Sequence, residues 1–233
     1  MKKYDVIDAF QKMFFVAISY IPLGIACGIA LQRVGFTPIG ILLMSLLAFT
    51  GAGQFMTSSM IGAGAPVLSI IILNLFLSLR MSLMTSSLSQ YLRGKTKPFL
   101  ALFGQTTADE TYGVNINEFE NNMEWTANKG LYANLVAYLT WAIGTWIGGM
   151  IGGVVNIPTT VINFLMTAMF ISLMVGNLTS NTYIIAGLIS GLLAIALKIL
   201  LQSNFALVFA AIIGSFIGYF LEAQKKEGIV NDR

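Results

Sequence analysis

The sequence predicts an all-α polytopic integral membrane protein, with about seven long transmembrane helices, one short or re-entrant segment and at least one broken helix. Of its 233 residues, 56 % are hydrophobic, and the mean hydropathy is +0.79. Charged residues make up 10 % of the chain, where a soluble domain has about 25 %. They are absent from four long stretches, residues 13–32, 34–79, 130–197 and 199–221.

These charge-free stretches define the expected organisation. A helix needs about 20 apolar residues to cross the hydrocarbon core of a bilayer, so the stretches hold about one, two, three and one crossings. We expect a cytoplasmic N-terminal segment at residues 1–12, a transmembrane transport domain at 13–221 and a charged C-terminal tail at 222–233. The later spans are expected at residues 131–151, 158–178, 181–200 and 203–221.

The second apolar stretch begins at Ile39 and is interrupted by Thr50-Gly51-Ala52-Gly53-Gln54-Phe55. Two glycines and an amide in mid-membrane predict a broken helix, and broken helices in transporters expose backbone groups to a substrate. The alternative is a close helix crossing, the role expected for the spaced small residues Gly24/Gly28, Gly144/Gly148, Gly149/Gly153, Gly187/Gly191 and Gly214/Gly218. We favour substrate binding, by Gly51, Gly53, Gln54 and Phe55.

A third span is expected to reach Gln90 and to carry a polar stripe that includes Asn74 and Ser78. Polar groups in a span face the bundle interior, either to bind substrate or simply to hydrogen-bond to neighbouring helices. We place Asn74 and Ser78, with Pro22 of the first span, among the candidate substrate-binding residues.

Arg80 lies near the middle of this third span, where an unpaired guanidinium costs roughly 2.5–3.5 kcal/mol. Asp109 and Glu110 are the acids placed against apolar sequence. We therefore expect Arg80, Asp109 and Glu110 to form one charge network, in which a carboxylate without a cation could bind and release a proton. The alternative is that both acids only cap the polar loop at the membrane interface.

Two features complicate the topology. The apolar piece Pro98–Gln105 is too short for a simple crossing and is either a tilted span or a re-entrant half-helix, followed by an expected acidic, Asn-rich loop at 115–129. The cationic clusters at the N-terminus, at Arg93–Lys97 and in the tail should all be cytoplasmic. Three crossings before Arg93 would put that loop outside, unless the Gly-rich stretch at 50–64 dips in and returns.

The composition also excludes functions. There is no histidine, and Cys27 is the single cysteine, so no disulfide, thiolate cluster or His-based nucleophile can form. The cations gather at segment ends, which is typical of topology signals rather than of nucleic-acid binding. We expect no enzyme activity, cofactor, metal site or nucleic-acid partner.

Several motifs, in this order and spacing, resemble the AzlC family over roughly residues 10–221. They are Ile18-Ser19-Tyr20-Ile21-Pro22 with Gly24 and Gly28, then Gly51-Ala52-Gly53-Gln54-Phe55, Arg80 followed by Ser87-Leu88, and Asp109-Glu110-Thr111-Tyr112. Members of that family are large subunits of bacterial two-component branched-chain amino acid exporters. Two positions depart from the family pattern, which has Asn or Asp at Ser78 and often His at Met81.

The resemblance implies secondary active export of valine, leucine or isoleucine across the bacterial plasma membrane. It also implies a small AzlD-type membrane protein as partner, and protons as a possible coupling ion. Two alternatives remain open at this point: a permease subunit of an ATP-driven transporter, and a membrane assembly protein that transports nothing. The short loops offer no evident coupling helix for an ATPase, and Arg80 with its two acids argues against a purely structural protein.

Overall fold

The computed structural model forms two compact units, Met1–Met166 and Thr167–Arg233, which are treated separately below. All the regular structure in the described part of the chain is helical. The described residues are 3–154, the single positions 158, 160, 161, 164, 167, 168, 171, 174 and 175, and residues 181–201, 209–210 and 212–220.

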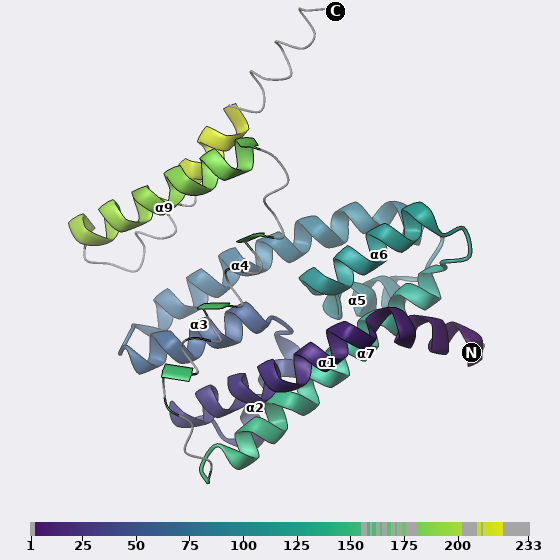
Figure 1. Ribbon diagram of the computed structural model, residues 1–233, viewed down its shortest axis with the longest axis horizontal. Coiled ribbons are helices and arrows are strands. Elements are labelled where there is room, and N and C mark those ends of the chain that lie inside the picture. Colours follow the sequence, from purple (N-terminus) through teal and green to yellow (C-terminus); the bar gives the residue numbers. More distant parts are fainter. Residues whose placement is uncertain are drawn as a thin grey trace, which may run out of the picture. The chain divides into compact units, whose positions relative to one another are not determined.

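The first unit contains seven α-helices and one short 3-10 helix among its described residues (Figure 1). They are α1 (Lys3–Arg33), α2 (Pro38–Leu47), α3 (Gly51–Gly62), α4 (Val67–Leu88), η1 (Ser89–Leu92), α5 (Lys97–Gln105), α6 (Asp109–Asn121) and α7 (Ala127–Ile151).

Four helices are long and apolar enough to cross a membrane, counting only the described residues: Tyr4–Arg33, Val67–Leu92, Ala127–Ile151 and Asn181–Leu200. This confirms an all-helical membrane protein. The count of about seven spans is not confirmed, and the expected spans at 158–178 and 203–221 lie largely outside the described residues.

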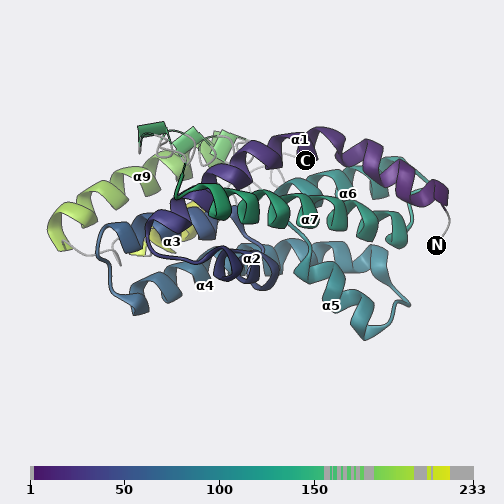
Figure 2. The same cartoon turned by 90° about the horizontal axis from the view of Figure 1, so that it is seen from below.

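Helices α1 and α7 lie side by side along most of their length and run in the same direction (Figures 1 and 2). Their contact is a glycine seam: a Cβ added to Gly28 would lie 2.8 Å from the backbone N of Gly149, and one added to Gly148 would lie 2.9 Å from the Cα of Ile25. Glycine at these positions lets two backbones approach, as in small-residue helix pairs of other membrane proteins. The packing role predicted for these glycines is confirmed.

Helix α2 runs from one end of α7 to its middle. At its start, the Cα of Pro38 lies 3.4 Å from a Cβ built on Gly149, near the end of α7. At its end, the carbonyl of Leu46 accepts a hydrogen bond of 2.6 Å from the hydroxyl of Tyr138, near the centre of α7. With 10 residues, α2 is about 15 Å long, half the hydrocarbon core.

The chain then reverses at residues 48–50, and α3 returns to the end from which α2 came. Gly51 starts α3 beside the ring of Trp141, near the middle of α7, and Gly62 ends it beside Val34, which directly follows α1. Helices α2 and α3 therefore form a re-entrant hairpin, here called the first hairpin. The Gly-rich stretch dips in and returns, which is one of the two alternatives that the sequence left open, and a crossing after Ile39 is not confirmed.

Helices α5 and α6 form a second hairpin that enters from the opposite end. Lys95 Nζ, just before α5, donates a 3.0 Å hydrogen bond to Asn128 at the start of α7. At the other end of α5, Gln105 reaches the tip of the first hairpin. Helix α6 returns outward until Glu118 pairs with Lys12 of α1 at 2.6 Å. Pro98–Gln105 is thus a half-helix, as one of the two alternatives predicted.

The prediction of a loop at 115–129 was wrong. Helix α6 continues to Asn121 and α7 begins at Ala127, so most of this segment is helical. The acidic, Asn-rich composition suggested a loop, but buried polar side chains of this segment have partners within the fold. Asn115 is fully buried, donates to Asn134 at 2.8 Å and accepts from Trp125 at 3.1 Å.

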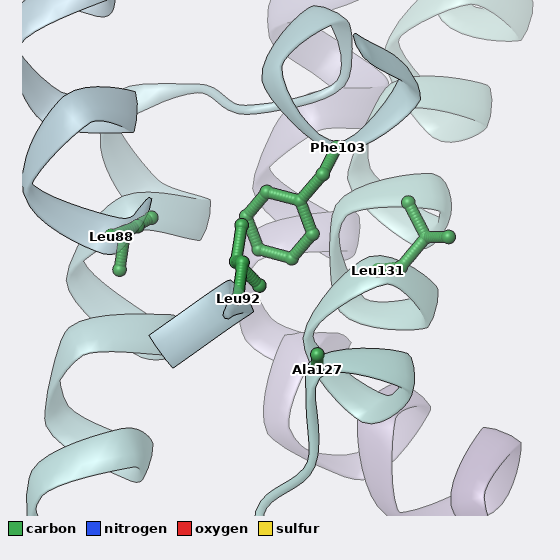
Figure 3. Close-up of a cluster of buried hydrophobic side chains, with 5 residues drawn as sticks. All are labelled: Leu88, Leu92, Phe103, Ala127 and Leu131. Atoms are coloured by element: carbon green, nitrogen blue, oxygen red, sulfur yellow. The ribbon is translucent and has the colours of Figure 1, made fainter. Parts of the chain in front are cut away.

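The arrangement removes the conflict over topology. Between the N-terminus and the basic loop Arg93–Lys97, only α1 and α4 are long and apolar enough to cross, and two crossings put both cationic clusters at the same end of the bundle. At that end, an apolar cluster closes the space between α4, η1, α5 and α7 (Figure 3). It contains Leu88, Leu92, Phe103, Ala127 and Leu131.

The second unit contains α9 (Asn181–Leu201) and the helical residues 212–220. A Cβ added to Gly214 would lie 2.7 Å from the Cβ of Ser190, and one on Gly218 would lie 3.1 Å from the Cβ of Ala186, so this pair packs against α9 as predicted. Gly187 and Gly191 meet no described atom within 4 Å.

Candidate functional site

The tips of the two hairpins meet near the centres of α4 and α7. Gln105, the last residue of α5, donates hydrogen bonds from Nε2 to the carbonyl oxygens of Leu46 and Leu47, at 3.2 and 2.9 Å. The last carbonyls of a helix have no partner inside it, and each one left unsatisfied in a bilayer costs several kcal/mol. Gln105 therefore supplies donors that the broken helix itself lacks.

A cavity of about 170 Å³ lies between these tips and the middle of α4. A cavity of roughly 150 Å³ is enough to hold benzene, so this one has room for a branched aliphatic side chain. Its lining is mixed, with both apolar and hydroxyl- or amide-bearing residues: Leu47, Ala48, Phe49, Thr50, Ser78, Met81, Gly104, Gln105 and Thr107.

The cavity also borders the start of α3. Thr50 is the N-cap of this helix, and its side-chain oxygen accepts a 3.3 Å hydrogen bond from the backbone N of Gly53. The N–H groups of Gly51 and Ala52 have no acceptor inside the helix, by helix geometry. The start of a helix with free N–H groups favours an anionic group.

The predicted ion pair is present beside this site. Arg80 of α4 contacts Asp109, the first residue of α6, with 2.7 Å between the guanidinium nitrogen and Oδ2. The other carboxylate oxygen of Asp109 is buried and has no hydrogen-bond partner among the described residues. Asp109 also stands in the first turn of α6, where a negative charge is stabilised by the helix dipole.

Glu110, the next residue, faces α1 rather than Arg80. Its carboxylate accepts a hydrogen bond of 2.5 Å from the hydroxyl of Tyr20, a side chain that is only 6 % exposed. The Tyr20 ring then packs edge-to-face on Trp141 of α7, with 5.2 Å between ring centroids. The two adjacent acids are therefore held by different helices, and both are in contact with polar groups.

A buried polar chain continues from Trp141. The indole Nε1 donates to Gln54 Oε1 at 2.6 Å, and Gln54 Nε2 donates to the hydroxyl of Ser45 at 2.8 Å. The Ser45 hydroxyl also lies 2.7 Å from that of Thr145. Gln54 thus ties α3 to α2 and α7, and both of its amide atoms already have partners in the protein.

The remaining predicted residues fall into two groups. Ser78 lines the cavity, and Asn74 lies one turn before it, where it donates to Thr57 at 3.0 Å. Pro22 is exposed on α1, and Phe55 is almost completely buried in α3, so neither lines the cavity.

Gly51 and Gly53 lie where a side chain has no space. A Cβ on Gly51 would lie 2.9 Å from the ring of Trp141, and a Cβ on Gly53 would lie 2.7 Å from the methyl of Thr50. Both glycines therefore allow the tip of the first hairpin to pack closely. Their backbone, not a side chain, is what they can offer to a ligand.

Sequence analysis gave no role to Gln105, Tyr138 or Trp141, and it named Tyr20 only as part of the family-like motif at residues 18–22. The importance of these four residues comes from contacts with residues 58 to 92 positions away. One signal was available: an amide at the end of a short apolar piece, directly before a pair of acids.

Fold and site together define an integral membrane protein with a cavity of mixed apolar and polar lining at the level of its helix centres. The family model described as AzlC protein matches residues 16–155, which is more than half of the chain and covers both hairpins. The chain belongs to the AzlC family.

Curated relatives agree with a membrane location. The chain is 32 % identical over 132 residues to an uncharacterized membrane protein of Archaeoglobus fulgidus, covering 57 % of this chain and 56 % of that protein. It is 27 % identical over 132 residues to the inner membrane protein YgaZ of Escherichia coli, covering 56 % of this chain and 54 % of that protein.

A third relative, an uncharacterized membrane protein of Helicobacter pylori, is 26 % identical over 107 residues, 46 % of each chain. The chain thus spans about half the length of the curated relatives it matches. No solved structure matches it.

Proposed function

We propose that this protein exports branched-chain amino acids such as valine, leucine or isoleucine across the bacterial plasma membrane, by secondary active transport and together with a small AzlD-type membrane protein. The observation that carries the proposal is the cavity between the two hairpin tips. It combines apolar walls with the start of a helix, whose first N–H groups have no acceptor inside that helix, near the centres of α4 and α7, and transporters bind their substrates at such breaks in mid-membrane.

The cavity has features that suit each part of such a substrate. The start of α3, at Thr50, offers backbone N–H groups to a carboxylate. Leu47, Phe49 and Met81 offer apolar surface to a branched side chain. The small volume disfavours large or highly charged solutes, since both would need more room or more counter-charge than the lining provides.

The neighbouring charge pair suits coupling to an ion gradient. Arg80 and Asp109 are partly buried at the centre of the bundle, and Glu110 is held by Tyr20 rather than by a cation. Ionisable groups at membrane depth mark ion and proton pathways in transporters. We propose protons as the coupling ion, with the acidic pair as the group that exchanges them.

The decisive experiment is counterflow of labelled valine in proteoliposomes, with and without the small partner and with and without a pH gradient. Exchange that requires both proteins, and accumulation that requires the gradient, would support the proposal. Full valine export by this chain alone would refute the two-component part, and no exchange of any branched-chain amino acid would refute the substrate.

A pair of matched variants locates the site. Ala48→Trp fills the cavity and should abolish counterflow, whereas Leu43→Trp, five residues earlier on α2, 50 % exposed and not part of the cavity lining, should leave it unchanged. Both changes add an indole to the first hairpin, so a difference between them reports on the cavity and not on insertion.

A further inference from the structure

The carbonyl oxygens at the end of α2 form a small acceptor cluster beside the cavity. Leu46 O receives hydrogen bonds from Tyr138 at 2.6 Å and from Gln105 at 3.2 Å, and Leu47 O receives one from Gln105 at 2.9 Å. These oxygens also carry the negative end of the α2 helix dipole. The cluster therefore favours a donor, and a cationic donor more than a neutral one.

The donor that now occupies the cluster is a neutral amide on an exposed side chain. Gln105 is exposed, lies on the wall of the cavity and reaches the cluster from the other hairpin. Its two bonds are neutral amide bonds, which contribute about 0.5–1.5 kcal/mol each, whereas bonds from a charged donor contribute about 1.5–3 kcal/mol. An ammonium group could replace the amide at the same two oxygens.

We propose that the carbonyl oxygens of Leu46 and Leu47 are the subsite for the ammonium group of the substrate, and that the amide of Gln105 occupies this subsite while no substrate is bound. Tyr138 is then a positioning residue, because its bond holds Leu46 O in place when Gln105 leaves. The inference rests on the proposed function, and adds to it which end of the amino acid binds where.

The position of the cluster fits a zwitterion. Only residues 48–50 separate the acceptor end of α2 from the donor end of α3, so opposite dipole ends flank one cavity. An α-amino acid carries its two charged groups on one carbon and can meet both. Departure of the amide would also release the contact between the two hairpin tips, which links binding to their movement.

A sodium ion is the other cation that backbone carbonyls bind in transporters. We favour ammonium because the cluster already holds an N–H donor at hydrogen-bond distances of 2.9 and 3.2 Å. The experiment therefore needs an arm in which choline replaces sodium.

The test measures binding of valine and of 3-methylbutanoate, which is valine without its amino group, to the purified full-length protein with its partner. Variants are Gln105→Met, which removes the donors at similar length, and Gln105→Lys, which tethers an ammonium at the subsite. Gln90→Met is the matched control, since Gln90 is an exposed glutamine whose amide bonds within its own turn.

We expect the wild type to bind valine at least 10-fold more tightly than 3-methylbutanoate. Gln105→Lys should weaken the binding of valine at least 10-fold without weakening the binding of 3-methylbutanoate. Gln105→Met should bind valine as tightly as the wild type or more tightly. Gln90→Met should change neither affinity. The Lys variant keeps a donor for the carbonyls, so it remains informative if the Met variant does not fold.

Equal affinity of the wild type for both ligands, or unchanged valine affinity in Gln105→Lys, would overturn the inference while leaving valine transport intact. Valine binding that requires sodium and loses this requirement in Gln105→Lys would assign the carbonyls to the ion and also overturn it. Absence of binding and counterflow for every branched-chain amino acid is the different result that would refute the proposed function itself.

Discussion

The hydroxyl of Tyr20 on α1 donates a hydrogen bond to the carboxylate of Glu110 on α6, 90 residues later in the chain, with 2.5 Å between the oxygens. This contact joins a membrane-crossing helix to the tip of the second hairpin. It also separates the two adjacent acids, because Asp109 is bound by Arg80.

The first prediction concerns this contact. If Glu110 exchanges the coupled proton, Glu110→Gln and Tyr20→Phe should both weaken the dependence of valine export on the pH gradient, while exchange without a gradient survives. Both changes nearly keep the side-chain volume: Glu110→Gln removes the ionisable group, and Tyr20→Phe removes the hydroxyl that donates to it. The control is Tyr112→Phe, which removes a tyrosine hydroxyl on α6 that accepts a 3.0 Å hydrogen bond from Ser87 rather than contacting Glu110. Unchanged gradient dependence in both variants would mean that Glu110 is structural.

The second prediction concerns Arg80 and Asp109. Arg80→Gln leaves a partly buried carboxylate without its cation and should destabilise the protein by about 1.5–3 kcal/mol, measured as thermal unfolding in detergent. Adding Asp109→Asn should recover part of this loss, because the unpaired charge is then removed. Strictly additive losses in the four-protein cycle would show that the pair contributes no coupling energy.

The third prediction concerns the topology of the hairpins. In a background where Cys27 is replaced by Ala, single cysteines at Val34 and Ala63 should react with an impermeant maleimide from one side of the membrane. Cysteines at Thr96 and Met123 should react from the other side, which the positive-inside rule makes cytoplasmic. Labelling of Val34 and Ala63 from opposite sides would mean that α2 and α3 form a crossing.

The fourth prediction concerns the seam between α1 and α7. Gly28→Val should lower expression and thermal stability strongly, because its Cβ would lie within 3 Å of backbone atoms of Thr145 and Gly149 that cannot move aside. Overpacking alone costs about 1–3 kcal/mol. Gly113→Val adds the same side chain to a glycine of α6. A Cβ built on Gly113 meets no atom within 4 Å outside its own stretch of helix, so this change should be far milder. Equal losses of stability in Gly28→Val and Gly113→Val would mean that the loss comes from the helix propensity of valine and not from the seam.

The fifth prediction concerns Glu118, which lies outside the four candidate spans. Burial alone would raise the pKa of this carboxyl, but hydrogen bonds from Lys12 and Asn122 and the charges of Lys12 and Lys129 outweigh it, so the pKa is lowered. A lowered carboxyl pKa stabilises the fold above the ordinary glutamate value of about 4.3, and this contribution is lost as the pH falls through the lowered pKa.

Lys12→Met should therefore reduce thermal stability near neutral pH and bring the remaining acid-induced loss to a higher pH than in the wild type. Thermal unfolding between neutral and acidic pH measures both effects. The control is Gln11→Met, an exposed neighbour on α1. Identical pH profiles for the wild type and Lys12→Met would show that the ion pair does not contribute.

The sequence predicted the parts of this protein that depend on local composition. Apolar runs, glycines and isolated charges in the sequence indicated three features. These are the first span, the break after Ile39 and the pairing of Arg80 with Asp109. The role of these residues in transport stays a prediction. The break itself falls at residues 48–50, just before the predicted glycines, because Thr50 caps α3.

Other features could not be read from composition. An apolar stretch long enough for a crossing looks the same whether the chain passes through or turns back, and only the partners of Gly62 and Leu46 distinguish the two. The second half of α6, from Asn115, was expected to belong to a loop, because the partners of its polar side chains, such as Asn134 and Lys12, lie on other helices. Long-range contacts of this kind leave no periodic signal.

The first hairpin also has a consequence for synthesis. The side chains that satisfy its polar groups come from α7: Tyr138, Trp141 and Thr145 contact Leu46, Gln54 and Ser45 across 87 to 100 residues of sequence. At about 5–20 residues per second, the ribosome makes the hairpin roughly 5–20 s before its partners. During that interval its polar groups need shelter outside the lipid. The hairpin can take its final place only when α7 has been made. Substitutions that remove the α7 contacts should therefore leave the first hairpin of the newly made chain unpacked and open to proteolysis.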